Sequence, residues 1–460
     1  MSTKVSGPQG PVISSRDELV AHLERGSKPA REWRIGTEHE KFGFYRRGFG
    51  PVPYDGKDGI RALLETMSER FCWEAVTESG KVIALNRPDC PKGGSVSLEP
   101  GGQLELSGAP LENLHETYEE LRQHLFEVAE VGGELGIGFL GLGFSPKWTL
   151  AETPVMPKER YGIMARYMPT RGRRGLDMMF RTATVQVNMD FSDERDMVAK
   201  LRVGLALQPV ATALFANSPF TDGRPNGFQS FRAEVWRDTD PDRTGLIPFA
   251  FEPGMGFERY VDYALGVPMY FVYRDGRYID VAGASFKDFL AGKLAALPGE
   301  RPTLDDWADH LTTLFPDVRL KHFLEMRGAD AGGFAQVWAL PALWTGLLYD
   351  KDALDGALAL TADWTVVELE GLRDMVPKLG LKTPFRGGTL RETAREVVAL
   401  ALGGLERRAR RDQNGEDERK ALTPLVAAIE EGLSPADRLL ALYHGPWHGE
   451  IDRIFGAEAF

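Results

Sequence analysis

The chain has 460 residues and a formal net charge of −12, with 43% hydrophobic and 27% charged residues. This length supports one large core or two to three smaller domains, and the composition is ordinary for a soluble globular protein. The negative charge argues against a nucleic-acid-binding surface and against binding to an anionic membrane. We expect no apolar run of the roughly 20 residues that span a bilayer, and no secretory signal or transit peptide in Met1–Val12.

Only two cysteines occur, Cys72 and Cys90, and no histidine stands at metal-ligand spacing. One disulfide between them is possible, but two thiols in a cytosolic protein are the simpler interpretation. Zinc sites, iron–sulfur clusters and disulfide scaffolds are therefore excluded. We expect a cytoplasmic protein whose partners include neither nucleic acid nor membrane.

The first strand predicted along the chain is Arg34–Phe42, in which Glu38 and Glu40 stand two residues apart. Side chains alternate between the two faces of a strand, so these carboxylates share a face. Taken alone, such a pair is more often the solvated face of an antiparallel sheet.

Two further strands are predicted at residues 95–99 and 103–107. The intervening Pro100-Gly101-Gly102 is typical of a turn. A hairpin of this kind places Glu99 and Glu105 side by side.

An amphipathic helix is predicted over Leu111–Ala129, where apolar residues recur three to four positions apart. The following segment, Gly136–Gly141, matches the dinucleotide-binding fingerprint letter for letter. That fingerprint needs a strand before it and a helix opening inside it, and here a helical stretch precedes it. We therefore reject a nicotinamide or flavin site.

Two more strands carry polar residues at a spacing of two. The polar face of residues 184–191 consists of Thr184, Gln186, Asn188 and Asp190. Residues 323–327 place Glu325 and Arg327 together. If these strands form one sheet, its polar face gathers Glu38, Glu40, Glu99, Glu105, Gln186, Asn188, Glu325 and Arg327.

From Asp350 onward the sequence becomes mostly helical, and Ser434-Pro435 is typical of a helix start with a serine cap. Between residues 30 and 350, helical stretches alternate with short strands, which predicts an α+β body. We expect one domain over residues 1–460, with an α+β body at about 30–350 and a helical part at about 351–460.

Carboxylates packed together raise one another's pKa unless a cation lies between them. Magnesium fits this role, because it prefers carboxylate oxygens and completes its shell with water and substrate phosphates. Two or more such ions on ATP would neutralise charge during phosphoryl transfer, and Arg327 would supply a fixed cationic fork for the phosphoryl group. Glycosidases also pair carboxylates, but they use two acting groups and leave the other acids unexplained.

A series of stretches together resembles one known family: Ile35–Phe44, Ser97–Gly108, Pro154–Lys158, Leu176–Thr182, Asn217–Phe220, Thr239–Gly245, Gly256–Tyr263 and Glu325–Asp330. They are similar to the plant-type glutamate–cysteine ligases, a family with plant and proteobacterial members. The resemblance covers residues 30 to 350 nearly without gaps and continues more weakly to Gly445.

The resemblance implies a body like that of glutamine synthetase, with a curved antiparallel sheet forming a bowl and helices behind it. It also implies the reaction. ATP converts the γ-carboxyl of L-glutamate into a γ-glutamyl phosphate, which the amine of L-cysteine attacks in the first step of glutathione biosynthesis. The partners would be these small molecules, and the protein a monomer or weak homodimer.

Residue roles also follow from the resemblance. The implied magnesium ligands are Glu38, Glu40, Glu99, Glu105, Gln186 and Glu325. The implied catalytic residues are Arg327, which contacts phosphate, and Arg232, which holds the carboxylate of glutamate. Further nucleotide contacts are expected from Arg181 and Asn188, and further substrate contacts from Arg181, Tyr270 and Phe334.

One departure from the family follows Asp330, where the usual Gly-Gly-Pro-Trp-Arg-Arg is replaced by Ala331–Gln336. Phe334 keeps an aromatic surface but loses the indole donor, which leaves the amine acceptor open. Two alternatives remain: a sister γ-glutamyl ligase that uses another amine, and a non-catalytic binding relative. The intact acids and Arg327 argue against the second.

Overall fold

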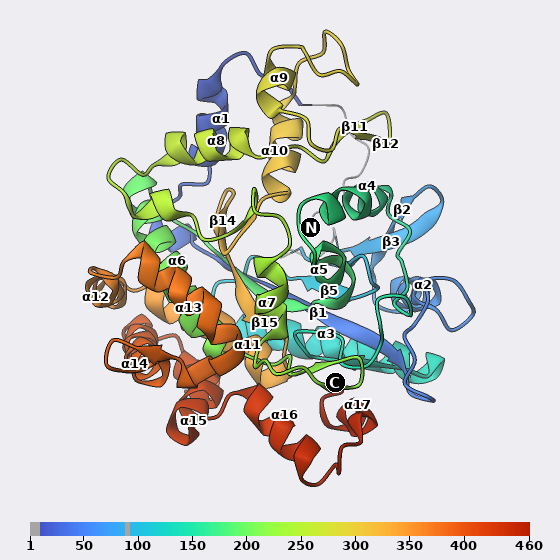
Figure 1. Cartoon of the computed structure of the whole chain (residues 1–460), viewed down its shortest axis with the longest axis vertical. Coiled ribbons are helices and arrows are strands. Elements are labelled where there is room, and N and C mark those ends of the chain that lie inside the picture. The colour runs from blue at the N-terminus through green and yellow to red at the C-terminus, as the bar shows by residue number, and fades with distance from the viewer. Residues whose placement is uncertain (1–9, 88–92) are drawn as a thin grey trace.

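The computed structural model describes residues 10–87 and 93–460. A nine-stranded sheet crosses the molecule, and helices cover both of its faces (Figure 1). Along the sheet the strands follow the order β14 (Val318–Leu320), β15 (Leu324–Asp330), β7 (Thr184–Met189), β1 (Ile35–Tyr45), β5 (Leu104–Ser107), β4 (Ser95–Leu98), β3 (Lys81–Asn86) and β2 (Glu74–Glu78). An additional strand, β6 (Ile137–Leu140), pairs with the second half of β1, and all of these pairs are antiparallel.

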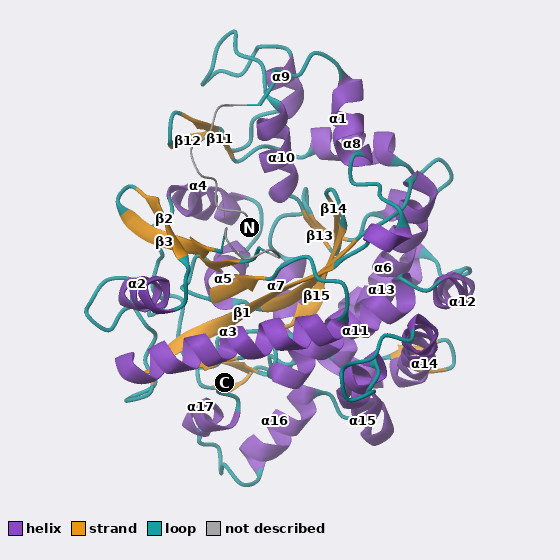
Figure 2. Ribbon diagram, turned by 180° about the vertical axis from the view of Figure 1, so that it is seen from behind, coloured by secondary structure: helices purple, strands orange, loops and turns teal. Residues whose placement is uncertain are grey.

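Long helices lie behind the sheet, as Figure 2 shows: α3 (Leu114–Leu135), α6 (Glu194–Leu214) and α11 (Phe334–Leu348). The shorter helices on the other side are α4 (Glu159–Tyr167), α5 (Gly175–Arg181) and α7 (Phe231–Arg237) (Figure 1). The aliphatic residues Val185, Val187 and Met189 of β7 join the main buried core together with residues of α6 and α11. Because neighbouring side chains alternate, the polar residues of β7 face away from this core.

The part after residue 350 is mostly helical, as predicted. It contains α12 (Lys351–Thr361), α13 (Val366–Leu379), α14 (Leu390–Arg408), α15 (Thr423–Glu431), α16 (Pro435–His444), α17 (Ile454–Ala457) and one short hairpin of β16 (Pro384–Phe385) and β17 (Gly388–Thr389). Helix α16 begins after Ser434, whose hydroxyl accepts the amide of Asp437 in a capping box. The predicted α+β class with a helical C-terminal part is confirmed.

Shorter helices and two-to-four-residue strands complete the fold. They are α1 (Arg16–Glu24), α2 (Ile60–Arg70), α8 (Phe257–Gly266), α9 (Phe286–Leu290), α10 (Leu304–Thr312), β8 (Phe220–Thr221), β9 (Arg224–Pro225), β10 (Thr244–Gly245), β11 (Phe271–Arg274), β12 (Arg277–Asp280) and β13 (Phe315–Pro316).

Helix α3 begins three residues later than its periodicity predicts. Asn113 caps it by accepting the amide of Glu116 at 3.0 Å, so the chain from Leu111 to Asn113 is extended rather than helical. The helix ends at Gly136 with φ +70°, and β6 follows directly. The glycines of the fingerprint thus belong to a helix end and a strand, which agrees with rejecting a dinucleotide site.

The expectation of no membrane-length apolar segment needs correction, and the possible disulfide falls outside the described residues. Helix α6 is long and apolar enough to cross a membrane by length and composition, whereas we expected no such segment. Of its most apolar window, 83% is buried inside the protein, as is typical of a core helix. Cys72 is exposed and Cys90 lies outside the described residues, so the possible disulfide stays untested.

Candidate active site

The acidic residues meet where β1 lies between β5 and β7. Glu40 of β1 is directly opposite Glu105 of β5, and Glu38 is directly opposite Gln186 of β7. Residues that are opposite each other in an antiparallel pair present their side chains on the same face. The spacing of two along each strand therefore brings these four side chains together.

The fourth carboxylate of the cluster, that of Glu99, comes from the turn between β4 and β5. The amide of Glu99 donates to the carbonyl of Gln103 at 2.9 Å, which closes the predicted hairpin. Gly102 has φ +84°, a conformation that favours glycine. At Gly101 an added Cβ would lie 2.1 Å from the carbonyl oxygen of Phe180, so the turn packs tightly against α5.

These acids line one hollow, which we call the acid-lined hollow. Its volume is 60 Å³, and it is lined by Glu38, Glu40, Glu99, Pro100, Gln103, Glu105, Met164, Met178, Met179, Thr182, Thr184, Gln186, Arg232, Trp236, Phe315, Arg319 and Arg327. Burial, together with the neighbouring Glu99 and Glu105, raises the pKa of Glu40 well above its usual range. Burial and Glu105 also raise the pKa of Glu99 to about 7. Burial and repulsion between the acids thus disfavour ionisation of Glu40 and Glu99, whereas hydrogen bonds with Glu99 and Ser97 help to lower the pKa of Glu105 to about 2 despite its burial.

Among the described residues, no group of three or more His, Cys, Asp and Glu side chains is arranged as a metal site. The acids are instead hydrogen-bonded to neighbours. Ser97 donates to Glu105 at 3.0 Å, the amide of Thr184 to Glu40 at 3.0 Å, and Asn188 to Glu38 at 2.9 Å. Carboxylate oxygens accept several partners each, so these bonds hold the acids without saturating them.

Glu325, an expected magnesium ligand, is held by three cations. Its carboxylate lies 2.6 Å from Arg319, 2.9 Å from Lys321 and 2.7 Å from Arg327. Burial would raise its pKa, but these cations hold the pKa well below its usual range. Glu325 is fully buried and does not line the acid-lined hollow, whereas Arg327 does and also donates to Gln186.

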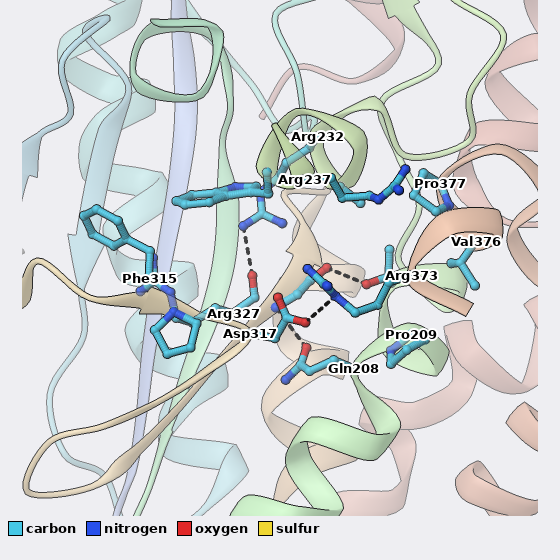
Figure 3. A pocket seen from close by; sticks show the side chains of 15 residues that line it. Gln208, Pro209, Arg232, Arg237, Phe315, Asp317, Arg327, Arg373, Val376 and Pro377 are labelled. Carbon is cyan, nitrogen blue, oxygen red and sulfur yellow. Dashed lines mark hydrogen bonds and ion pairs between the residues drawn. The ribbon is translucent and has the colours of Figure 1, made fainter. Parts of the chain in front are cut away.

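A second hollow adjoins the first, and we call it the arginine-lined hollow (Figure 3). Its lining includes Arg232, Arg237, Arg327 and Arg373, and it shares Arg232, Trp236, Phe315 and Arg327 with the acid-lined hollow. In Figure 3 the guanidinium of Arg232 points to the carbonyl of Arg327, to which it donates at 2.9 Å. Arg373 comes from α13 and pairs with Asp317 at 2.9 Å.

Arg181, for which we expect nucleotide and substrate contacts, does not line either hollow. Its guanidinium donates to Asp177 at 3.2 Å, to Asp222 and to the carbonyl of Trp148 at 2.7 Å. The side chain is nearly fully buried. Asp177 and Asp222 thus pair with Arg181, and the contact with Asp222 ties it to the loop after β8.

Tyr270, Phe334 and Asn188 also do not line either hollow. Arg243 lies 3.8 Å from the ring centre of Tyr270, which is buried in the core. The Phe334 ring packs on Tyr118 of α3 at 5.0 Å, behind the sheet. The substrate contacts expected of both aromatic residues therefore stay predictions, and Asn188 donates to Glu38 at 2.9 Å.

Sequence reasoning missed Arg319, Arg373 and Trp236 as lining residues. Arg319 lies on β14, directly opposite Glu325 on β15. Strand β14 has only three residues, so its alternation gives no clear signal in the sequence. No signal marks Arg373 either, since its place in the lining depends on how α13 packs.

The sheet and its layers of helices share their fold with a solved glutamate–cysteine ligase. A crystal structure of glutamate–cysteine ligase from Francisella tularensis in complex with AMP superposes with a TM-score of 0.51 at 12% sequence identity. The match covers 93% of this chain and 87% of that one. The predicted glutamine-synthetase-like fold is confirmed.

The sequence profile of glutamate-cysteine ligase family 2 matches residues 34–457. A chloroplastic glutamate–cysteine ligase of Brassica juncea is 56% identical over 96% of this chain and 83% of its own length. The Arabidopsis thaliana protein of the same name is 55% identical over 96% and 82%. The chain therefore belongs to the glutamate–cysteine ligase family 2, as its resemblance predicted.

The predicted cytoplasmic location is contradicted by the same comparison. The relatives from Brassica juncea, Medicago truncatula, Oryza sativa and Arabidopsis thaliana are all named as chloroplastic proteins. The prediction rested on cysteine content and on the residues Met1–Val12, neither of which identifies a compartment inside the cell.

Proposed function

We propose that the protein ligates the γ-carboxylate of L-glutamate to the amine of L-cysteine at the expense of ATP, the first step of glutathione biosynthesis. The observation that supports this most is the junction of the two hollows at Arg232 and Arg327. One hollow suits a metal-bound polyphosphate, and the other suits the carboxylate of an amino acid. Membership of the family supports the same reaction.

Two or more magnesium ions are proposed to bind Glu38, Glu40, Glu99, Glu105 and Gln186. All five side chains offer oxygen ligands and line one hollow, and burial together with neighbouring acids raises the pKa values of two of them, Glu40 and Glu99. Magnesium would neutralise the phosphate oxygens of ATP there. Glu325 can join this set only by giving up contacts with Arg319, Lys321 or Arg327.

The protein's own cations are proposed to orient the substrates. Arg327 is fixed by Gln186 and Glu325 at the junction, so its guanidinium can bind a phosphoryl oxygen without reorganising. Arg232 is proposed to hold the carboxylate of glutamate, because its guanidinium donates to a backbone carbonyl and its Nε has no hydrogen-bond partner among the described residues. An arginine is suited to this role because it binds carboxylates through two parallel hydrogen bonds.

Cysteine is the proposed acceptor. The departure from the family at Phe334 and Ala335 lies outside both hollows, so it does not favour a different amine. The whole chain is proposed to be one catalytic domain, because Arg373 of the helical part lines the same hollow as Arg232. Small molecules are the proposed partners, and a monomer or weak homodimer is the proposed state.

Incubation with MgATP and glutamate, with and without candidate amines, tests the proposal. We expect phosphate release that requires both glutamate and cysteine, and a γ-glutamylcysteine product identified by mass spectrometry. Release with another amine but not with cysteine would replace the proposal with a sister ligase. Folded protein without turnover under any of these conditions would indicate a binding relative.

A further inference from the structure

Helix α7 carries Arg232 on its first turn, and two serine hydroxyls hold this turn. The amide of Arg232 donates to Ser218 Oγ at 3.1 Å, and the amide of Ala233 donates to Ser230 Oγ at 3.1 Å. Both serines are fully buried. The hydroxyls therefore satisfy helix amides that would otherwise lack an acceptor.

Both hydroxyls in turn donate to one buried carboxylate, that of Asp330 at the end of β15. Ser218 Oγ lies 2.6 Å from Oδ2, and Ser230 Oγ lies 2.7 Å from Oδ1. The amide of Asn217 completes the set at 2.8 Å from Oδ2. A hydroxyl that donates to a carboxylate cannot rotate freely, so its lone pairs stay directed at the α7 amides.

The guanidinium end of Arg232 is anchored on the same strand. It donates to the carbonyl of Arg327, three residues before Asp330 on β15. Strand β15 thus fixes Arg232 at both ends, through Asp330 and the serines at the backbone and through a carbonyl at the guanidinium. Asp330 itself lies outside the lining of both hollows.

Asp330 has little freedom to move. An added Cβ at Gly143 would lie 2.3 Å from the Cγ of Asp330, so backbone packs directly against the carboxylate group. Only 1% of the residue is exposed. The three donors and this close backbone contact define a single position for the carboxylate.

We infer that Asp330 is a positioning residue for the ligase reaction: through Ser218 and Ser230 it fixes the orientation of Arg232 without touching a substrate. The inference rests on the proposed role of Arg232 in binding the carboxylate of glutamate. It adds a residue on which affinity for glutamate depends and which strand periodicity does not single out.

The variant Asp330→Asn tests this with little change of shape. An amide has one acceptor oxygen, so one serine loses its partner and the α7 turn loosens. We expect the KM for glutamate to rise about tenfold or more, in the range typical of supporting residues, while the KM for MgATP stays within about twofold. Equal rises in both KM values, or none, would overturn the inference.

Asp306→Asn is a matched control. Asp306 is also buried, and its carboxylate accepts the amide of Thr303 at 2.8 Å in the cap of α10. It lies outside both hollows, so this variant should lower stability without changing the KM for glutamate. The variant Ser218→Ala removes one hydroxyl only and should raise the KM for glutamate less than Asp330→Asn does. It replaces Asp330→Asn as the test if that variant does not fold.

A double variant distinguishes positioning from a general structural role. If Asp330 acts through Arg232, adding Asp330→Asn to Arg232→Ala should not raise the KM for glutamate further. Independent, additive effects would contradict the inference.

Hydrogen exchange gives a readout that does not depend on turnover. The amides of Arg232 and Ala233 should exchange faster in Asp330→Asn than in the wild type, and unchanged exchange would overturn the inference. Wild-type protein without glutamate-dependent turnover would overturn the proposed function, whereas the exchange result would still decide whether Asp330 fixes α7.

Discussion

The carboxylate of Glu325 contacts three cations, Arg319, Lys321 and Arg327, and none of its surface is exposed. Burying ions costs desolvation free energy, which their mutual attraction offsets only while every partner is present. Two of the three cations, Arg319 and Arg327, also line the acid-lined hollow. The same carboxylate therefore contributes to the stability of the fold and to the position of cations near the proposed ATP site.

Replacing Glu325 with glutamine should destabilise the protein. The buried Arg319 and the partly buried Lys321 and Arg327 would lose their common carboxylate, and breaking a buried pair typically costs about 3–5 kcal/mol of the free energy of unfolding. Urea denaturation measures this change. The control is Glu252→Gln, which removes a mostly exposed partner of Arg259 and should cost less than about 1 kcal/mol. Equal, small effects in both variants would contradict the prediction.

Replacing Glu99 with glutamine should remove magnesium-dependent use of ATP. The change keeps the shape of the side chain but removes one of the charges that would attract the metal, and we expect phosphate release to fall at least about 100-fold. Circular dichroism should show an unchanged fold. Turnover like that of the wild type would rule out Glu99 as a ligand.

At the scale of elements, strand periodicity predicted the acid cluster but gives no information on residues that tertiary packing places. Glu38, Glu40 and Gln186 share a face because a spacing of two is fixed by strand geometry alone. The positions of Tyr270 and Phe334 depend on which helix packs over them, and no local pattern encodes that. The family resemblance named these residues, but their contacts became visible only in the folded chain.

The short strand β14 shows a second limit of prediction from the sequence. It has three residues, Val318–Leu320, too few for alternation to stand out from chance. Helix α3 was found by its period of 3.6, yet its start was misplaced because Asn113 rather than the apolar pattern sets it. Caps and short strands are thus where sequence reasoning lost precision.

Because the turn between β4 and β5 is tightly packed, we expect one methyl group added at Gly101 to lower stability and turnover. In Gly101→Ala the new Cβ would meet the carbonyl of Phe180 at 2.1 Å, so the turn that carries Glu99 must move. We expect a loss of roughly 1–3 kcal/mol of stability together with reduced ATP turnover. Thermal unfolding and phosphate release measure the two effects.

Gly133→Ala is the matched control for this change. Gly133 lies in α3, and an added Cβ there has no neighbour within 4 Å. Alanine favours the helix over glycine by up to about 1 kcal/mol, so stability should rise slightly and turnover should not change. If both alanine variants behaved alike, close packing at Gly101 would not be the cause.

At the scale of the whole molecule, stability in acid depends on histidines that are buried in neutral form. His310 is one of them: burial, with a smaller contribution from Arg243, lowers its pKa from 6.5 to about 4. Between these values the unfolded chain binds a proton that the folded protein does not. The free energy of unfolding should therefore fall as the pH falls from about 6.5 to 4, by about 1.4 kcal/mol per pH unit from this group.

The variant His310→Gln tests this dependence. Glutamine does not titrate and can still donate to the carbonyl of Ala264, which accepts from His310 at 2.8 Å. Urea denaturation at several pH values should show that this variant loses less stability than the wild type between pH 6.5 and 4. An unchanged slope would show that His310 does not contribute.

The order of strands in the sheet has a consequence for the synthesis of the chain. Strand β7 ends at Met189, but its partner β15 begins at Leu324, and Arg373 of the arginine-lined hollow comes later still. While a ribosome adds the intervening residues, the open edge of β7 exposes unpaired N–H and C=O groups, which can pair with other chains. Protection of this edge during translation would therefore favour the state in which Arg232, Arg327 and the acids line adjoining hollows.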